Sequence, residues 1–146
     1  MKRVLLATDG SESALKAARF LNSMAATHAE LKVAVVTVVP VPQPIALATM
    51  AGTNYVPDVP VDAMVRNEAE PILERTLEVL GLESERVTKE VLVGAPAEEL
   101  CRLARAEHYD MIVLGNRGLN PIKEFLMGSV SDRCLHLAPC PVLIVK

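Results

Sequence analysis

Two hydrophobic periods alternate along the chain. Residues Arg3–Ala7 (RVLLA) form a short apolar run, which is typical of a strand buried on both faces. Residues 11–28 instead place apolar side chains three and four positions apart, which predicts an amphipathic helix with Ser11 as its N-cap. The same patterns predict further strands at 31–39, 86–94, 110–115 and 141–146, and further helices at 62–80, 95–108 and after Ser129.

The order of these elements, β-α-β-α-β-α-β-α-β, indicates the fold class. Continuous apolar strands that alternate with amphipathic helices predict an α/β protein whose parallel sheet has helices on both faces. In such doubly wound sheets, ligands bind at the carboxyl ends of the strands, where the strand order reverses. A length of 146 residues is typical of one domain with its own core. We therefore expect a single domain over 1–146.

Prolines decide the interpretation of an uncharged stretch at 33–57. The stretch is long enough to span a membrane, but prolines interrupt it at positions 40, 42, 44 and 57. A strand followed by a variable loop at 40–61 explains it better, and this loop is either a lid over a ligand or an ordinary surface loop. Pro71 falls inside the helix predicted at 62–80, where we expect a kink or break.

A glycine-rich segment joins the strand at 110–115 to the next helix. Gly115, Gly118 and Gly128 follow the pattern G-x2-G-x9-G, and Ser129 comes next. Without a Cβ at Gly118 and Gly128, backbone N–H groups can approach a ligand closely, and a helix N-terminus attracts an anion such as phosphate. We expect Ser129 to open the helix, with SVSD at 129–132 as a capping box. Glycines that only form turns, with Ser129 capping its own helix, are the alternative.

Polar side chains surround this segment in the sequence. Ser131 adds a hydroxyl, and Arg117 and Lys123 add positive charge. Asp9 follows the first strand and lies at the same sheet edge as Gly115 if their strands are neighbours. Its carboxylate is then placed to accept hydrogen bonds from a ribose or to help hold a metal ion on a phosphate. Capping of its own turn is the alternative for Asp9.

Composition argues against several function classes. The net charge is -3 and aromatic residues make up 3%, so the chain lacks the basic surface and the stacking platform of a nucleic-acid binder. The apolar run after the first residues is too short for a signal peptide. The three cysteines include no CxxC pair and match no zinc pattern. We therefore expect reduced, buried thiols in a cytoplasmic protein without nucleic-acid or membrane partners.

Together these motifs resemble the universal stress protein family, in its nucleotide-binding subclass. The resemblance covers essentially the whole chain. The family's proline in P-T-D-x-S-x-x-A is replaced by Ala7, which removes no polar group that contacts a ligand. The motifs occur in the family's order: ATDGSESA at 7–14, V-G-x-P at 93–96, D-x-I-V-x-G at 110–115, G-x2-G-x9-G-S at 115–129 and P-V-L-I-V at 141–145.

The resemblance implies a five-stranded parallel sheet in the order 3-2-1-4-5, a Rossmann-like fold of the adenine nucleotide α-hydrolase type. It also implies an adenine nucleotide as ligand, ATP or else ADP or AMP, with Mg²⁺ or Mn²⁺ bridging the phosphates near Asp9. The implied contacts are the phosphates along Gly118, Gly128, Ser129, Val130 and Ser131 with Arg117 nearby, the ribose near Asp9 and Gly115, the adenine at the backbone of Val38, and the entrance at Ala7 and Thr8.

The family's members are usually homodimers, and the end of the chain supports the same expectation. Residues 142–145 (VLIV) predict an edge strand that is apolar on both faces. An uncovered edge of this kind is an aggregation hazard, and pairing with a second copy around a two-fold axis covers it. A monomer that shields the edge with its own chain is the alternative.

Three function classes compete for this sequence. The first is an ATP-binding regulatory module of the stress response with at most slow ATP hydrolysis and an unidentified protein partner. The second is a dedicated ATPase or nucleotidyl-transfer enzyme, and the third is a dimeric scaffold without nucleotide. The complete glycine loop argues against the third class. Against the second, no lysine opens the helix after the loop, and His28, His108 and His136 lie near helix ends, so we expect no catalytic residue.

Overall fold

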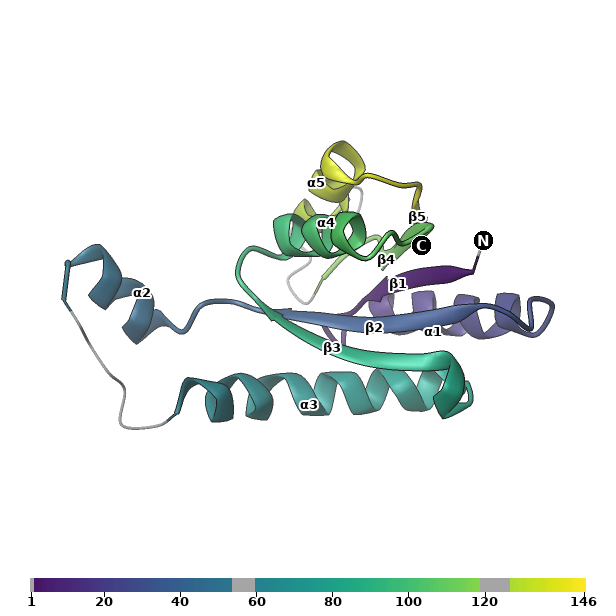
Figure 1. Ribbon diagram of the computed structural model, residues 1–146, viewed down its shortest axis with the longest axis horizontal. Helices are drawn as coiled ribbons and strands as arrows, with labels where there is room; N and C mark the ends of the chain where they lie inside the picture. Colours follow the sequence, from purple (N-terminus) through teal and green to yellow (C-terminus); the bar gives the residue numbers. More distant parts are fainter. Residues whose placement is uncertain (1, 54–59, 119–126) are drawn as a thin grey trace.

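A five-stranded parallel sheet forms the centre of the protein (Figure 1). The computed structural model describes residues 2–53, 60–118 and 127–146. The strand order is β3-β2-β1-β4-β5, which confirms the predicted fold class and the order implied by the family resemblance. The strands are β1 (Arg3–Ala7), β2 (Lys32–Val39), β3 (Val87–Val93), β4 (Met111–Gly115) and β5 (Val142–Val145).

Helices cover both faces of this sheet. Helices α1 and α3 lie on one face and α4 and α5 on the other (Figure 1). Strand β1 shows why, because Val4 and Leu6 pack against α1 and α3, whereas Leu5 between them packs against α4 and α5. The helices are α1 (Glu12–Ala25), α2 (Gln43–Met50), α3 (Val61–Leu80), α4 (Pro96–Ala106) and α5 (Ser129–Leu137), with a 3-10 turn at Ser84–Arg86.

The N-cap of α1 is the residue that the sequence predicts. Ser11 has an extended backbone, and its hydroxyl accepts a hydrogen bond from the N–H of Ala14 at 3.2 Å. This bond gives a partner to one of the N–H groups that the helix itself leaves unpaired. It also fixes the start of α1 at the carboxyl end of β1, beside the predicted site.

The segment predicted as a loop at 40–61 contains helix α2, so that prediction is wrong. Pro42 is the N-cap of α2, and Pro44 lies in its first turn, where the missing N–H costs no hydrogen bond. Helix α2 buries none of its residues and stands beyond one end of the sheet (Figure 1). Among the described residues, no helix is both long and apolar enough to cross a membrane.

Helix α3 continues through Pro71, so of the predicted kink or break the break is wrong. Pro71 is exposed, and the buried residues Ala69 and Leu73 on either side of it hold the helix against the sheet. Tertiary packing of this kind outweighs the one backbone hydrogen bond that proline removes. The predicted end at Gly81 is confirmed, since this glycine has the left-handed conformation (φ 58°) of a helix C-terminus.

Two of the three cysteines are buried in the core between the sheet and helices α4 and α5. Burial raises the pKa of the Cys101 thiol, and it raises the pKa of Cys134 to about 12. Cys140 is half-buried and packs against the same core, and burial raises its pKa as well. The thiols are therefore protonated at neutral pH and pack as small apolar side chains, as the sequence predicts for Cys101 and Cys134.

Candidate functional site

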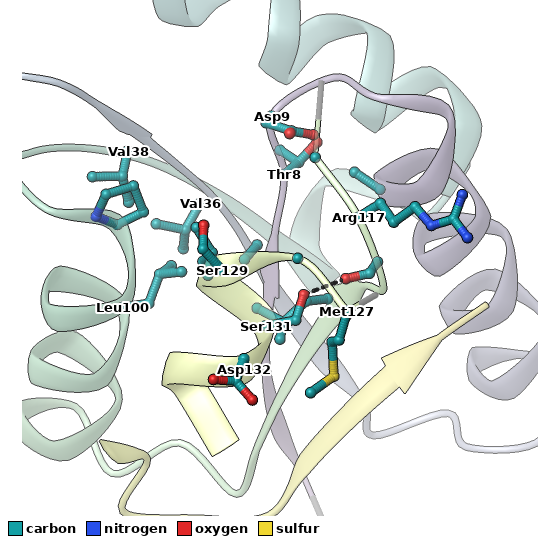
Figure 2. A pocket seen from close by; sticks show the side chains of 18 residues that line it. Thr8, Asp9, Val36, Val38, Leu100, Arg117, Met127, Ser129, Ser131 and Asp132 are labelled. Carbon is teal, nitrogen blue, oxygen red and sulfur yellow. Dashed lines mark hydrogen bonds between the residues drawn. The ribbon is translucent and has the colours of Figure 1, made fainter. Parts of the chain in front are cut away.

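A cavity of about 710 Å³ lies at the carboxyl ends of β1, β2 and β4, between the first turns of α4 and α5 (Figure 2). Its size is typical of a small-molecule site. Every contact residue implied by the family resemblance lines this cavity: Ala7, Thr8, Asp9, Val38, Gly115, Arg117, Gly118, Gly128, Ser129, Val130 and Ser131. Segments that are far apart in the sequence therefore meet where the doubly wound fold places a ligand.

One side of the cavity is apolar, and most of it was not predicted. Val36 and Val38 of β2, Pro96 and Leu100 of α4, and Leu114 of β4 line it. Strand periodicity is a signal for Val36, because side chains two positions apart share one face of a sheet. Helix periodicity connects Pro96 with Leu100 in the same way. These aliphatic side chains form a surface on which a planar ring can pack.

The N-terminus of α5 also lines the cavity. Gly128, with φ −63° and ψ 149°, is the N-cap, and Ser129 is the first residue of the helix. No side chain caps this end of α5. The predicted capping box is therefore wrong, because Ser129 lies one position too far into the helix. The backbone N–H groups of Ser129, Val130 and Ser131 have no backbone acceptor within the described ranges. They form a group of donors at the positive end of the helix dipole.

Two hydrogen bonds hold this helix end against β4. The Ser131 hydroxyl donates to the carbonyl oxygen of Gly115 at 2.8 Å, the bond drawn in Figure 2. The N–H of Gly128 donates to the carbonyl oxygen of Asn116 at 2.8 Å. Both Ser131 and Gly128 were predicted to contact phosphate. The structure engages the Ser131 hydroxyl and the Gly128 N–H internally and leaves the first turn of α5 facing the cavity.

Close approaches explain why residues 118 and 128 are glycines. A Cβ at Gly128 would lie 3.3 Å from Cα of Arg117, and a Cβ at Gly118 would lie 2.8 Å from Oδ2 of Asp9. A side chain at either position would therefore push the two halves of the glycine segment apart or displace the Asp9 carboxylate. Residues 119–126 between them, with Lys123 and Glu124, lie outside the described residues.

Asp9 closes its own turn and also lines the cavity, so its ligand role stays a prediction. Its Oδ1 accepts a hydrogen bond from the N–H of Ser11 at 3.0 Å, which closes a turn. Its Oδ2 lies close to Gly118, 2.8 Å from the position that a Cβ there would take. The neighbouring hydroxyl of Thr8 is engaged inside the protein, because it pairs with the Thr76 hydroxyl at 2.8 Å and accepts from the N–H of Gly10.

The charged and titratable groups near the cavity are few. Arg117 lines the cavity, but its side chain points away from Ser129 (Figure 2) and also lines a second cavity of about 270 Å³ with Lys16 and Lys146. Asp132 adds an exposed carboxylate to the lining of the main cavity. No histidine or lysine lines the main cavity in the described part of the chain. A group of three His, Cys, Asp or Glu side chains suited to a metal ion is also absent from the residues that the structure describes.

Similar proteins are known in several organisms. A model of the Universal stress protein family matches residues 1–146. Universal stress protein YxiE of Bacillus subtilis is 32% identical over 154 residues, which cover 99% of this chain and 98% of YxiE. The structure of MJ0577 from Methanocaldococcus jannaschii has a TM-score of 0.77 and 26% identity, covering 99% of this chain and 95% of MJ0577. A universal stress protein solved in complex with cAMP has a TM-score of 0.61 and 26% identity, covering 99% and 96% of the two chains.

Proposed function

Because the chain belongs to the universal stress protein family, we propose that it is a regulatory protein of the stress response. Its proposed ligand is an adenine nucleotide, with ATP preferred. One observation carries the proposal. A single cavity combines the N-terminus of α5, the carboxylate of Asp9 and an apolar wall from β2 and α4. These three features match the phosphate, sugar and base of a nucleotide in their chemistry. A cytoplasmic location belongs to the same proposal.

The proposed orientation follows from the chemistry of each wall. Phosphate oxygens accept from the N–H groups of Ser129 and Val130 at the positive end of α5. Asp9 accepts hydrogen bonds from the ribose hydroxyls. The base packs between β2 and α4 and bonds to backbone near Val38. The relative solved with cAMP supports an adenine nucleotide as the class of ligand.

A divalent cation fits this arrangement only if it bridges Asp9 and the phosphates of the nucleotide. Mg²⁺ prefers oxygen ligands, and Oδ2 of Asp9 lies close to Gly118, one of the residues that the family resemblance assigns to the phosphates. The ion would be held by Asp9 together with nucleotide phosphates, and when bound it would neutralise phosphate charge. The measured nucleotide affinity with and without Mg²⁺ tests this role.

Binding without dedicated catalysis is the activity that the lining supports best. Phosphoryl transfer needs a group that orients the attacking water and positive charge on the phosphate that is transferred. The described lining offers Arg117 as a cation and carries no histidine. We propose slow ATP hydrolysis at most. Turnover counted with pure protein, ATP and Mg²⁺ separates this class from a dedicated ATPase. Nucleotide that is retained through purification, identified by mass, excludes a nucleotide-free scaffold.

We expect Asp9→Ala to weaken nucleotide binding by about 1–3 kcal/mol, the usual cost of losing a hydrogen bond to a charged group. Asp9→Asn is the matched control, since its side-chain oxygen can still accept from the N–H of Ser11 and keep the turn. Isothermal titration of ATP into the parent and both variants measures the effect. If both variants bind as the parent does, with and without Mg²⁺, Asp9 only caps its turn.

We also propose a homodimer through β5. This strand lies at the edge of the sheet, and its four residues are half-buried. Leu143 packs toward the α1 and α3 side, whereas Ile144 packs toward the α4 and α5 side. In a two-fold pairing centred on this strand, the central residues Leu143 and Ile144 lie nearest the axis, close to the same residues of the second copy.

Lysine at either position is expected to shift the dimer toward monomer by roughly tenfold or more in dissociation constant, because two like charges then meet near the axis. Sedimentation of Leu143→Lys and Ile144→Lys measures the shift. Circular dichroism must accompany it, since both side chains also contact the core. Two well-folded variants that remain dimers would place the interface elsewhere.

A further inference from the structure

We propose that Ser13 of α1, together with Asn116, is a positioning pair for the anion-binding end of α5. The inference rests on the proposed nucleotide site and adds residues that the site itself does not contain. Neither Ser13 nor Asn116 lines the main cavity, and both line the smaller cavity on the other side of the turn. They therefore act on the site through the backbone of the turn and touch no ligand bound in the main cavity.

The hydroxyl of Ser13 joins α1 to the turn after β4 by two hydrogen bonds. It donates to Oδ1 of Asn116 at 2.8 Å and accepts from the backbone N–H of Arg117 at 3.3 Å. One side chain of α1 thus fixes both the side chain of one loop residue and the backbone of the next. Helix α1 is itself fixed, because its residues Ala17, Ala18 and Leu21 are fully buried.

Gly115 permits this contact. A Cβ at position 115 would lie 2.5 Å from the carbonyl carbon of Ser13, closer than real Cβ contacts come. The end of β4 and the first turn of α1 therefore touch backbone to backbone, and residue 115 has no room for a side chain. The sequence shows a glycine here, but its partner is 102 positions away.

Asn116 passes the constraint on to α5. Its carbonyl oxygen accepts from the N–H of Gly128, the N-cap of α5, and its own N–H donates to the carbonyl oxygen of Val145 at the end of β5. A chain of hydrogen bonds therefore runs from Ser13 through Asn116 to Gly128. Removing the side chains of Ser13 and Asn116 leaves in place every N–H group that is proposed to contact phosphate. It removes the hydrogen bonds that hold the turn before α5 against α1.

The test compares Ser13→Ala, Asn116→Ala and the double variant, with ATP and Mg²⁺ as the probe in isothermal titration. Asn116→Ala removes one of the two hydrogen bonds and Ser13→Ala removes both, and we expect each single variant to bind about three- to tenfold more weakly, with Ser13→Ala the weaker. The double variant is expected to be no weaker than the weaker single variant, because the two side chains act as one unit. Ser23→Ala is the matched control on α1, since it also removes a side-chain hydrogen bond, to the carbonyl oxygen of Phe20. It is expected to bind as the parent does.

Amide hydrogen exchange without nucleotide tests the same chain of contacts independently of binding. The N–H groups of Arg117 and Gly128 are expected to exchange faster in Ser13→Ala, while buried amides of α3 keep the parent's rate. A parent that binds no nucleotide would overturn the proposed function. The exchange rates alone would then show whether Ser13 and Asn116 hold the N-terminus of α5 in place. Parental affinity in both single variants, additive losses in the double variant, or unchanged exchange at Gly128 would each overturn this inference. If Ser13→Ala does not fold, the same criteria apply to Asn116→Ala.

Discussion

Gly115→Ala is expected to lower the free energy of unfolding by about 3 kcal/mol, at the upper end of what overpacking in a core costs. The added Cβ would lie 2.5 Å from the Ser13 carbonyl carbon, and backbone on both sides leaves no flexible group to give way. Helix α1 must move away from β4, and its contacts with the fully buried Val113 of that strand weaken. Urea unfolding of parent and variant measures the difference.

Gly118→Ala is the matched control for this prediction. Among the residues that the structure describes, its Cβ would meet only Oδ2 of Asp9, at 2.8 Å, and a carboxylate at the end of a side chain can move. Its stability is expected to stay within about 1 kcal/mol of the parent, which is the range of most surface substitutions. A Gly115→Ala protein as stable as Gly118→Ala would show that α1 and β4 are not in backbone contact.

Gly128→Val is expected to weaken nucleotide binding by more than about 100-fold, equivalent to some 2.7 kcal/mol. The Cβ alone would lie 3.3 Å from Cα of Arg117 and 3.4 Å from the carbonyl oxygen of Asn116, and valine adds two methyl groups. The turn and the N-terminus of α5 must then separate, and the hydrogen bond from Gly128 to Asn116 is lost. The donors of the first turn no longer face one point in the cavity.

Isothermal titration of ATP checks this loss, with Leu135→Val as the control on the exposed side of α5. The control introduces the same β-branched residue, valine, into α5 and leaves the turn untouched. The phosphate assignment is wrong if Gly128→Val binds ATP as tightly as this control. Circular dichroism of both variants shows whether the helix content is retained.

Local patterns in the sequence predict much of the fold. The strands of the core are apolar runs, and the helices carry an apolar stripe, so their type and order could be read directly. Asp9 and the glycine segment could be placed at one sheet edge because parallel strands end together. The strand order and the roles of single residues came from the family resemblance, since spacing alone left the glycine segment open to a turn-only interpretation.

The misses have two physical causes, an ambiguous local signal and contacts between distant segments. Proline both ends helices and begins them, so its local chemistry did not separate a loop at 40–61 from helix α2. Helix α3 passes Pro71 because residues on either side are buried against the sheet, which is a tertiary effect. The reason for Gly115 and the roles of Ser13 and Asn116 depend on a contact between segments 103 positions apart. A short stretch of sequence cannot show a contact between residues so far apart.

The central claim is that the first turn of α5 binds the phosphates of a nucleotide. The most direct measurement is a titration of isotope-labelled protein with ATP and Mg²⁺, followed by amide resonances in two-dimensional NMR. The amides of Ser129, Val130 and Ser131 are expected to shift most, since their N–H groups gain charged acceptors. Saturating shifts at these residues and at Gly118 would support the account. Shifts that occur only elsewhere, or no shifts at millimolar ATP, would contradict it.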